Sequence, residues 1–328
     1  MDNNKIPGNC EDKLFKVRPI IESVRKRCLE LQVEESVCID EQIIPFKGHL
    51  GIKQYIKGKP CPWGLKVCLI CEKSDYPYDF VLYQGSSTEV SKFDRAHLGW
   101  GASVIKHLAQ RLKEPGHCLY FDNYFSSYQI FEILSQLKIN AAGTVRINRF
   151  NCASFSSETE LKKKGRGTSE QISSRNGDIV LVKWQDNRSV HLASNFVGVG
   201  IEEDIVRWDK KLKQNVTIKI PEIIRKYNQS MGGVDLFDQY MSYYRIFIKS
   251  RKWTLRVIFH FVDVAVCASY IEYKNNCEKM KIPKNKIMTL IDFKLKLGWC
   301  LTKVNPKPDN IQKRRRSETV DVSNQGFL

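Results

Sequence analysis

The sequence predicts a mixed α/β fold, in which a sheet flanked by helices is interrupted by a small β-rich insertion. Residues 36–85 contain three short β-prone runs separated by turn residues, which favours an antiparallel meander. Between about residues 98 and 145, helical and strand patterns alternate, as is typical of a mixed sheet. Residues 146–220 are turn-rich and strand-like without a long helix, which indicates the insertion.

The first predicted element is an amphipathic helix near the N-terminus. Its apolar residues recur at spacings of three to four, so one face of the helix needs a partner to cover it. These residues are Phe15, Ile20, Ile21, Val24, Cys28 and Leu31. The meander follows, with its strands expected at SVCIDEQIIPF, GLKVCLICEK and YDFVLYQG.

The alternating segment supplies two helices and two strands. A helix is expected over LGWGASVIKHLAQRLKEPG, closed by Pro115 and Gly116. The elements expected after it are a strand at CLYF, a helix at SSYQIFEILSQLK and a strand at INAAGTV.

Helical spacing returns after the insertion. PEIIRKYNQ begins with Pro221, which suits a first helical turn, and VDLFDQYMSYYRIF continues with helical spacing. WTLRVIFHFVDVAVCASYIEY is apolar on nearly all sides, so we expect a buried helix there. Residues 309–328 are polar and charged, and we expect them to form a disordered basic tail.

The chain of 328 residues carries 53 Lys and Arg against 36 Asp and Glu, a formal net charge of +17. This excess predicts a polyanionic partner, for which nucleic acid is the usual candidate, and no small-molecule substrate is expected. A basic surface that serves only solubility is the alternative. The N-terminus has no apolar signal segment and no run of about 18 apolar residues occurs, so we expect no membrane partner.

Eleven cysteines are scattered without a framework spacing, which predicts reduced and mostly buried thiols. The one CxxC pair, Cys68 and Cys71, lies in an apolar strand-like run without a second pair at zinc-finger distance. We therefore expect strand residues there and no zinc site. The six histidines are dispersed, and none is assigned a catalytic role.

Two aspartates follow apolar β-type runs directly. Asp40 comes after Val37 to Ile39, and Asp122 comes after Leu119 to Phe121. An ionised carboxylate removed from water is costly unless it is paired, hydrogen-bonded or bound to a cation. If the two strands are neighbours in the sheet, the two carboxylates can converge on one ion. Ends of strands that simply face solvent are the alternative.

A further acidic pair, Asp235 and Asp238, lies in GGVDLFDQ at a spacing that places both on one face of a helix. The two glycines before it permit a close approach. Together the aspartates have the composition of a site for hard cations such as Mg²⁺ or Mn²⁺, and Asp40, Asp122 and Asp235 suffice to hold two ions. The alternative is that Asp235 only caps its helix.

These blocks resemble the piggyBac transposase family. The resemblance runs from about residue 12 to 273, and its three strongest segments are CIDEQIIPFKG, LYFDNYFSS and EIIRKYNQSMGGVDLFDQYMSYYRI with the following SRKWTLRVIFHFVDVAVCASYIEY. It implies an RNase H-like catalytic core whose catalytic and metal-binding aspartates are Asp40, Asp122 and Asp235, with Asp238 as a supporting acid.

The resemblance also implies a reaction: Mg²⁺-dependent cleavage at transposon ends through hairpin intermediates and strand transfer to TTAA targets. DNA is then the partner, a homodimer is possible and the location is nuclear, for which Lys313 to Arg316 could be an import signal. Candidate phosphate contacts are Lys47, Lys57, Lys59, Arg146, Arg149, Lys249, Arg251, Lys252 and Arg256. Aromatic residues that could stack on an unpaired base, or belong to the core, are Trp63, Tyr124, Trp184 and Trp253.

The predicted domain boundaries follow from these elements and from the resemblance. They are a remnant of a helical DNA-binding and dimerisation domain at 1–35, the first part of the catalytic core at 36–145, the β-rich insertion at 146–220, the last part of the core at 221–248, a helical DNA-binding and dimerisation part at 249–308 and the tail at 309–328.

The flanks of this chain differ from those expected of an active family member. Only about 39 residues precede Asp40, and no cysteine-rich module follows the core. Three hypotheses therefore stay open: a catalytic transposase core, a domesticated protein that binds DNA without cutting it, and a truncated product that folds poorly because the N-terminal helix lacks partners.

Overall fold

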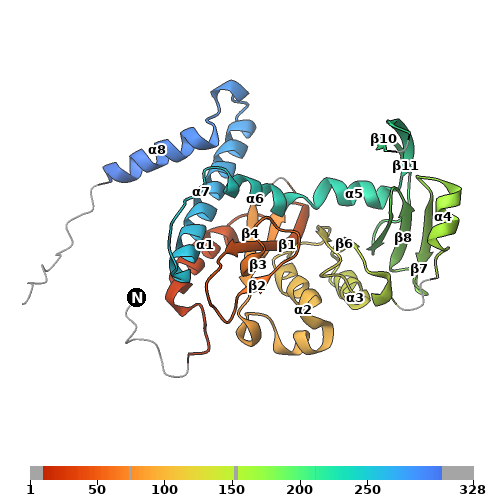
Figure 1. Cartoon of the computed structure of the whole chain (residues 1–328), viewed down its shortest axis with the longest axis horizontal. Helices are drawn as coiled ribbons and strands as arrows, with labels where there is room; N and C mark the ends of the chain where they lie inside the picture. Colours follow the sequence, from red (N-terminus) through yellow and green to blue (C-terminus); the bar gives the residue numbers. More distant parts are fainter. Residues whose placement is uncertain (1–9, 74, 151–153, 211, 305–328) are drawn as a thin grey trace, which may run out of the picture.

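The computed structural model of the chain describes residues 10–73, 75–150, 154–210 and 212–304 (Figure 1). The helices in these ranges are α1 Arg18–Leu29, α2 Lys92–Ala109, α3 Tyr128–Gln136, α4 Glu158–Lys164, α5 Glu222–Ser230, α6 Gly233–Ser242, α7 Trp253–Lys279 and α8 Leu290–Lys303. The strands are β1 Ser36–Pro45, β2 Gln54–Tyr55, β3 Trp63–Glu72, β4 Pro77–Leu82, β5 Cys118–Phe121, β6 Asn140–Thr144, β7 Ser169–Ser173, β8 Val180–Gln185, β9 Ser189–Ser194, β10 Glu203–Asp209 and β11 Gln214–Ile220.

The described residues form a nine-stranded mixed sheet and a separate hairpin of β10 and β11. The main path runs β2-β3-β1-β5-β6-β9-β8-β7, and β4 pairs with β3. β1 is antiparallel to β3 but parallel to β5, and β5 is parallel to β6. The predicted meander is therefore present in β1, β3 and β4, and the predicted mixed α/β sheet is confirmed.

Three strands of the predicted insertion, β7, β8 and β9, belong to the central sheet, and only β10 and β11 form a sheet of their own among the described residues. β9 pairs antiparallel with β6, and β8 and β7 continue the same sheet beyond it. Residues 180–194 thus extend the central sheet, while the β10–β11 hairpin lies at the far end of the molecule from α8 (Figure 1).

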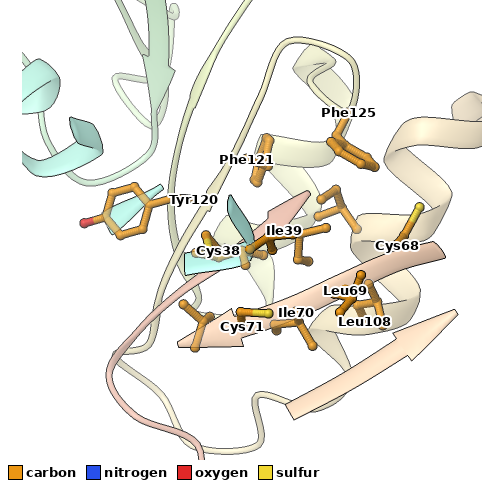
Figure 2. Packing of buried hydrophobic residues seen from close by; sticks show 14 of the residues in the cluster. Cys38, Ile39, Cys68, Leu69, Ile70, Cys71, Leu108, Tyr120, Phe121 and Phe125 are labelled. Atoms are coloured by element: carbon orange, nitrogen blue, oxygen red, sulfur yellow. The ribbon is translucent and has the colours of Figure 1, made fainter. Parts of the chain in front are cut away.

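The core of the sheet is buried on both faces, which explains why β3 is almost continuously apolar in sequence. β3 is buried from Gly64 to Cys71, so the CxxC cysteines lie inside the sheet. Cys71 is the register partner of Cys38 on β1, and Figure 2 shows both in one cluster with Ile39 and Phe121. Burial raises the pKa of the Cys68 thiol to about 12, as expected of an unreactive core thiol.

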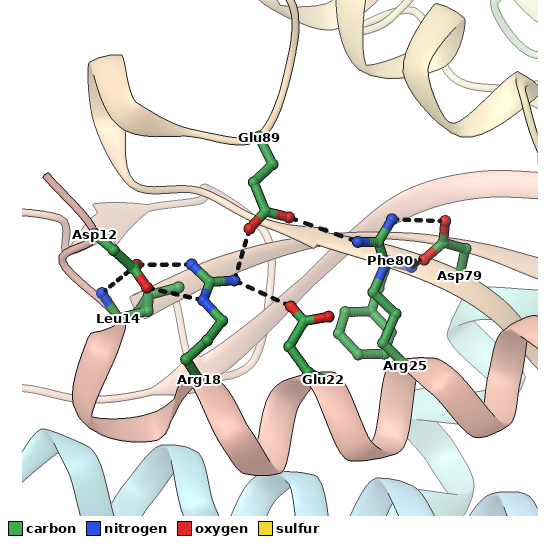
Figure 3. Close-up of polar contacts among 8 residues, drawn as sticks. All are labelled: Asp12, Leu14, Arg18, Glu22, Arg25, Asp79, Phe80 and Glu89. Carbon is green, nitrogen blue, oxygen red and sulfur yellow. Dashed lines mark hydrogen bonds and ion pairs between the residues drawn. The ribbon is translucent and has the colours of Figure 1, made fainter.

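The N-terminal helix α1 finds its partners within the chain. Its buried residues Ile21 and Cys28 belong to the main core, and the helix contacts β4 and α7. Figure 3 shows how its outer face is fixed: Arg25 Nε lies 2.7 Å from Asp79 Oδ1 on β4, and Arg18 binds Asp12 at 2.7 Å. The apolar face predicted to need a partner is covered.

The long helix α7 passes the length and composition test for a membrane span, but half of its most apolar window is buried inside the protein. Val257, Phe261 and Val264 are buried in the core, and α7 contacts β1, α1 and α6. Burial in the core therefore accounts for its apolar composition, as predicted from the sequence.

Two helices differ from the sequence prediction. The helix predicted over residues 98–116 starts earlier, at Lys92 with Ser91 as its N-cap, ends at Ala109 and contains a kink at Gly99, where φ is +75°. The helix predicted to reach Phe247 ends at Ser242 instead. Tyr244 has a left-handed φ of +53°, and Ile246 N donates to Asp263 Oδ2 on α7 at 3.1 Å. A tertiary hydrogen bond thus replaces the helical one.

Candidate active site

Asp40, within β1, and Asp122, directly after β5, lie side by side where the pairing between these two strands ends. β1 and β5 are parallel neighbours whose register ends with Ile39 opposite Phe121, and each aspartate is the next residue on its strand. Adjacent strands are about 4.8 Å apart, and residues in the same register project to the same face of a sheet. The condition set from the sequence, that the two strands are sheet neighbours, is met.

The carboxyl group of Asp40 is held in a poorly solvated position. Its Oδ1 accepts a hydrogen bond from the backbone N–H of Glu41 at 2.8 Å. Burial raises the pKa of Asp40 to about 8, and the neighbouring Glu41 side chain adds to the rise. Lys59 acts in the opposite direction by attracting the ionised form. In the absence of a bound cation, Asp40 therefore holds its proton near neutral pH.

Asp122 is oriented by the loop that follows β5. Its Oδ1 accepts the backbone N–H of Tyr124 at 2.8 Å, and its carbonyl accepts the Ser126 hydroxyl at 3.0 Å. Burial raises the pKa of Asp122, and the charge of Glu41 raises it further. The backbone N–H donors of the loop partly offset both effects by favouring the ionised carboxylate.

The acidic helix α6 approaches the sheet through one of its two glycines. A Cβ on Gly233 would stand 1.9 Å from the carbonyl oxygen of Glu72 and 3.0 Å from Cys38 Sγ, so only glycine allows this contact. Gly232 has no atom within 4 Å of its Cβ position, and its φ of −80° suits any residue. The close approach predicted for both glycines therefore depends on Gly233 alone.

Lys59 lies between the acids of α6 and Asp40 of β1. Its Nζ lies 3.2 Å from Asp235 Oδ1 and 4.0 Å from Asp238 Oδ2. The pKa of Lys59 is raised: burial alone would lower it, but the charges of Asp40, Asp235 and Asp238 together outweigh the cost of burial. The four predicted aspartates are thus distributed over β1, the loop after β5 and α6, and three of them face the same ammonium group.

The donor set suits a hard cation, although no cage is preformed. Across the described ranges of the chain, no group of three or more His, Cys, Asp or Glu side chains is arranged to hold a metal ion. Carboxylate oxygens are nevertheless the ligands that Mg²⁺ and Mn²⁺ prefer. The ammonium of Lys59, in contact with Asp235, is a cation drawn to the same carboxylates. The residues present therefore fit a divalent ion.

A buried ion pair beside the aspartates was missed by the sequence reasoning. Glu41 Oε1 lies 3.1 Å from Lys66 Nζ, and both side chains are buried. The same ammonium stands 4.0 Å from the ring centroid of Tyr124, in the loop that orients Asp122. The signal was available: Glu41 and Lys66 are charged residues within two strands predicted to be buried, where an isolated charge is costly.

A second buried chain of polar groups fixes Asp238. Gln42 Nε2 donates a very short hydrogen bond to Asp238 Oδ1, and Gln42 Oε1 lies 3.0 Å from His260 Nε2 on α7. Burial lowers the pKa of His260 to about 3, so the ring is neutral and its Nε2 is the donor to Gln42. No sequence pattern predicted that His260 would contact Asp238 through Gln42.

The predicted phosphate contacts fall into different surroundings. Lys47, Arg251 and Arg256 line one cavity of about 800 Å³ at the end of β1. Lys59 is bound to Asp235. The remaining lysines of the set are exposed and have no ion pair within the described residues: Lys57, Lys249 and Lys252.

The two arginines after β6 hold the Asp122 loop. Arg146 Nε donates to Asn123 Oδ1 at 3.0 Å. Arg149 Nη1 donates to three backbone carbonyls, those of Asn123, Tyr124 and Ser126, at 3.0 to 3.1 Å. Both guanidinium groups are therefore tied to the loop that presents Asp122, whatever further contact they make.

Comparison with known proteins shows which family the chain matches. The chain matches a family model described as Transposase IS4 over residues 1–270. It is 34% identical over 246 residues to the human PiggyBac transposable element-derived protein 3, covering 74% of this chain and 41% of that protein. It is 28% identical over 287 residues to the human PiggyBac transposable element-derived protein 2, covering 86% and 47%. The chain thus spans less than half the length of these relatives.

The fold also matches a solved structure, a piggyBac transposase synaptic complex with hairpin DNA. The TM-score is 0.72 with 24% sequence identity, and the match covers 92% of this chain and 60% of that one. The nine-stranded sheet and its flanking helices are therefore an arrangement also found in a transposase.

Proposed function

The chain belongs to the transposase IS4 family as a piggyBac-type member, and on this premise we propose that it is the core of a metal-dependent DNA transposase. The substrate is DNA at transposon ends, and the product is a strand joined to a TTAA target. The observation that carries the proposal is that Asp40 and Asp122 are neighbours on two adjacent parallel strands, at the point where the pairing of β1 with β5 ends.

Asp40, Asp122 and Asp235 are the residues that would hold Mg²⁺ or Mn²⁺, two ions in all. The chemistry supplied by such ions is activation of the attacking oxygen and neutralisation of charge on the phosphate and leaving oxygen. The chain's own part is to hold the carboxylates in place. Asp122 is positioned by the N–H of Tyr124, and Asp238 by Gln42, so these two acids keep their orientation before DNA arrives.

Lys59 would have to leave Asp235 when the acids bind metal. Its ammonium lies 3.2 Å from Asp235, where it offsets negative charge while the acids are free. A divalent ion held by these carboxylates would supply the positive charge that Lys59 now supplies, and the ammonium would then be free to contact a phosphate of the DNA backbone. The predicted role of Lys59 as a phosphate contact is therefore compatible with its observed pairing with Asp235.

Metal binding is the first test. Isothermal titration of Mn²⁺ into the wild-type chain should show binding that is about tenfold weaker or lost in Asp122→Asn, because one carboxylate ligand is removed. The matched control is Asp204→Asn on the exposed β10 strand, which should bind as the wild type does. Absence of Mn²⁺ binding to the wild type would sink the catalytic proposal.

The second test is strand transfer. A DNA end with a free 3′ hydroxyl, a plasmid target and Mn²⁺ should yield joined products whose sequenced junctions lie at TTAA. Products at random tetranucleotides would contradict the target proposal while leaving the chemistry intact.

DNA binding without catalysis is the second candidate function. The Lys59–Asp235 ion pair favours it, because a cationic side chain already contacts one of the acids that would hold metal. This candidate is supported if duplex binding survives Asp122→Asn and no metal-dependent product forms. We also infer a nuclear location from the DNA substrate; Lys313 to Arg316 lie outside the described residues.

A further inference from the structure

A cavity of about 800 Å³ opens beside the candidate active site, and none of the four candidate aspartates lines it. It lies between the loop after β1, the residues that lead into β3, and the segment between α6 and α7. Its volume falls within the roughly 300–1,000 Å³ typical of sites for small ligands or parts of ligands. The side chains that matter are Lys47, Trp63, Phe247, Arg251 and Arg256.

Two aromatic rings in the cavity wall are exposed rather than packed. Trp63 is 47% exposed and Phe247 is 78% exposed, although both are large apolar side chains. Trp63 is supported from one strand away by Tyr55, with ring centroids 4.9 Å apart. Exposed aromatic rings in a cavity supply flat surfaces for another ring, and burying them would remove apolar area from water.

The same cavity carries uncompensated positive charge. Within the described residues, Lys47, Arg251 and Arg256 make no ion pair, and no Asp or Glu lines the cavity. A ligand that fits must therefore combine a planar ring with negative charge. A nucleotide has this combination, since its base stacks on aromatic rings and its phosphate binds guanidinium groups.

We propose that this cavity holds an unpaired nucleotide of the DNA strand, a few nucleotides from the reacting phosphate. The base stacks against Trp63 or Phe247, and the adjoining phosphates contact Arg251 and Arg256. A base inside an intact duplex cannot reach these rings, because its faces are already stacked. The site therefore selects DNA that is frayed, overhanging or looped near the break.

The position of the cavity agrees with this use. Pro60 lines it, and the preceding residue Lys59 contacts Asp235 at 3.2 Å, so the cavity borders the candidate active site. At about 3.3 Å per residue, Pro45 in the cavity wall is about 17 Å along β1 from Asp40. The strand between the reacting phosphate and the stacked base is then a few nucleotides long. The inference rests on the proposed function for its DNA partner.

The test is equilibrium binding in metal-free buffer, so that it does not depend on catalysis. Two DNAs of equal sequence and charge content are compared: a blunt duplex and a partial duplex with an unpaired end that carries 2-aminopurine. The wild type should prefer the unpaired end and quench its fluorescence. Trp63→Leu and Phe247→Leu should lose about five- to a hundredfold in affinity for the unpaired end and keep their affinity for the blunt duplex.

Two control variants sharpen the result. Trp208→Leu removes a tryptophan of similar exposure, 54%, on β10 and should change neither affinity. Arg251→Gln should weaken binding to both DNAs and lower the slope of log affinity against log salt by about 0.7–0.9.

Unchanged binding of both aromatic variants to the unpaired end would overturn the proposal, and so would an equal loss on both DNAs. Phe247 is so exposed that its replacement leaves the core intact, which keeps the test valid if Trp63→Leu fails to fold. A preserved preference for unpaired ends without metal-dependent strand transfer would sink the proposed function and leave this inference standing.

Discussion

Among the candidate aspartates, Asp40 is the one whose pKa is raised furthest, to about 8. Burial is the main cause, and the Glu41 carboxylate adds to it, while Lys59 acts against it. A carboxyl group in this position is poised to exchange its proton for a cation, because the ionised form is stable only when positive charge arrives.

This perturbation predicts a pH dependence of stability. The folded pKa of about 8 lies above the unfolded value of 3.8. The contribution of Asp40 to the unfolding free energy is therefore fully present below pH 3.8 and is lost as the pH rises through 8. In metal-free urea denaturation, the unfolding free energy of the wild type should fall between pH 5 and 8 relative to Asp40→Asn. The difference is about 1.4 kcal/mol for each unit of raised pKa.

Saturating Mn²⁺ should reverse that trend for the wild type, because metal binding needs the ionised carboxylate. The exposed Asp204→Asn variant should follow the wild-type profile throughout. Parallel profiles of wild type and Asp40→Asn would show that Asp40 is ionised in the folded protein at neutral pH, against the expectation.

At the scale of elements, the position of α6 depends on one glycine. Gly233 touches the Glu72 carbonyl and Cys38, so the start of α6 lies directly on β1 and β3. This contact holds the helix that carries Asp235 and Asp238 against the strand that carries Asp40. Gly232, one residue earlier, has open space around it and serves as an internal comparison.

The contact predicts opposite outcomes for two alanine substitutions. Gly233→Ala should destabilise the protein by about 1–3 kcal/mol or more, because its Cβ overlaps backbone atoms and α6 must move. It should also weaken Mn²⁺ binding. Gly232→Ala should be close to neutral in both urea denaturation and calorimetry. Equal effects of the two variants would mean that α6 is not positioned by this approach.

The whole molecule is organised by one sheet and one continuous core. Buried residues from α1, the central strands, the β8–β9 pair and α7 belong to a single apolar cluster, and β9 joins β6 directly. Arg25 and Asp79 tie α1 to β4 across the outside of this core. The N-terminal helix therefore has the partners whose absence would have made the chain fold poorly.

A continuous core predicts cooperative unfolding. Loss of far-UV circular dichroism and of tryptophan fluorescence should coincide in one sharp transition, because β8, which carries the buried Trp184, shares the core with β1. Trp184→Phe identifies the part of the fluorescence signal that comes from β8. Two separated transitions, with β8 melting first, would show that residues 180–194 form an independent unit.

Much of the fold and part of the site were predictable from sequence because their signals are local. The apolar runs around Cys38 and Tyr120 are strands, and the acids that follow them stand out because a buried run ends in a charge. The spacing of Asp235 and Asp238 on one helical face is equally local. The family resemblance rested on these same segments.

What the sequence determined by itself was therefore the mixed α/β class, the four aspartates and the family, since each depends on neighbouring residues or short motifs. Only the tertiary structure decided that β1 and β5 are parallel neighbours, that Lys59 lies among the acids and that His260 braces Asp238 through Gln42. It also ended α6 at Ser242, where a hydrogen bond from Ile246 to Asp263 replaces a helical one. These features arise from contacts between residues far apart in the chain, whose energies no local pattern encodes.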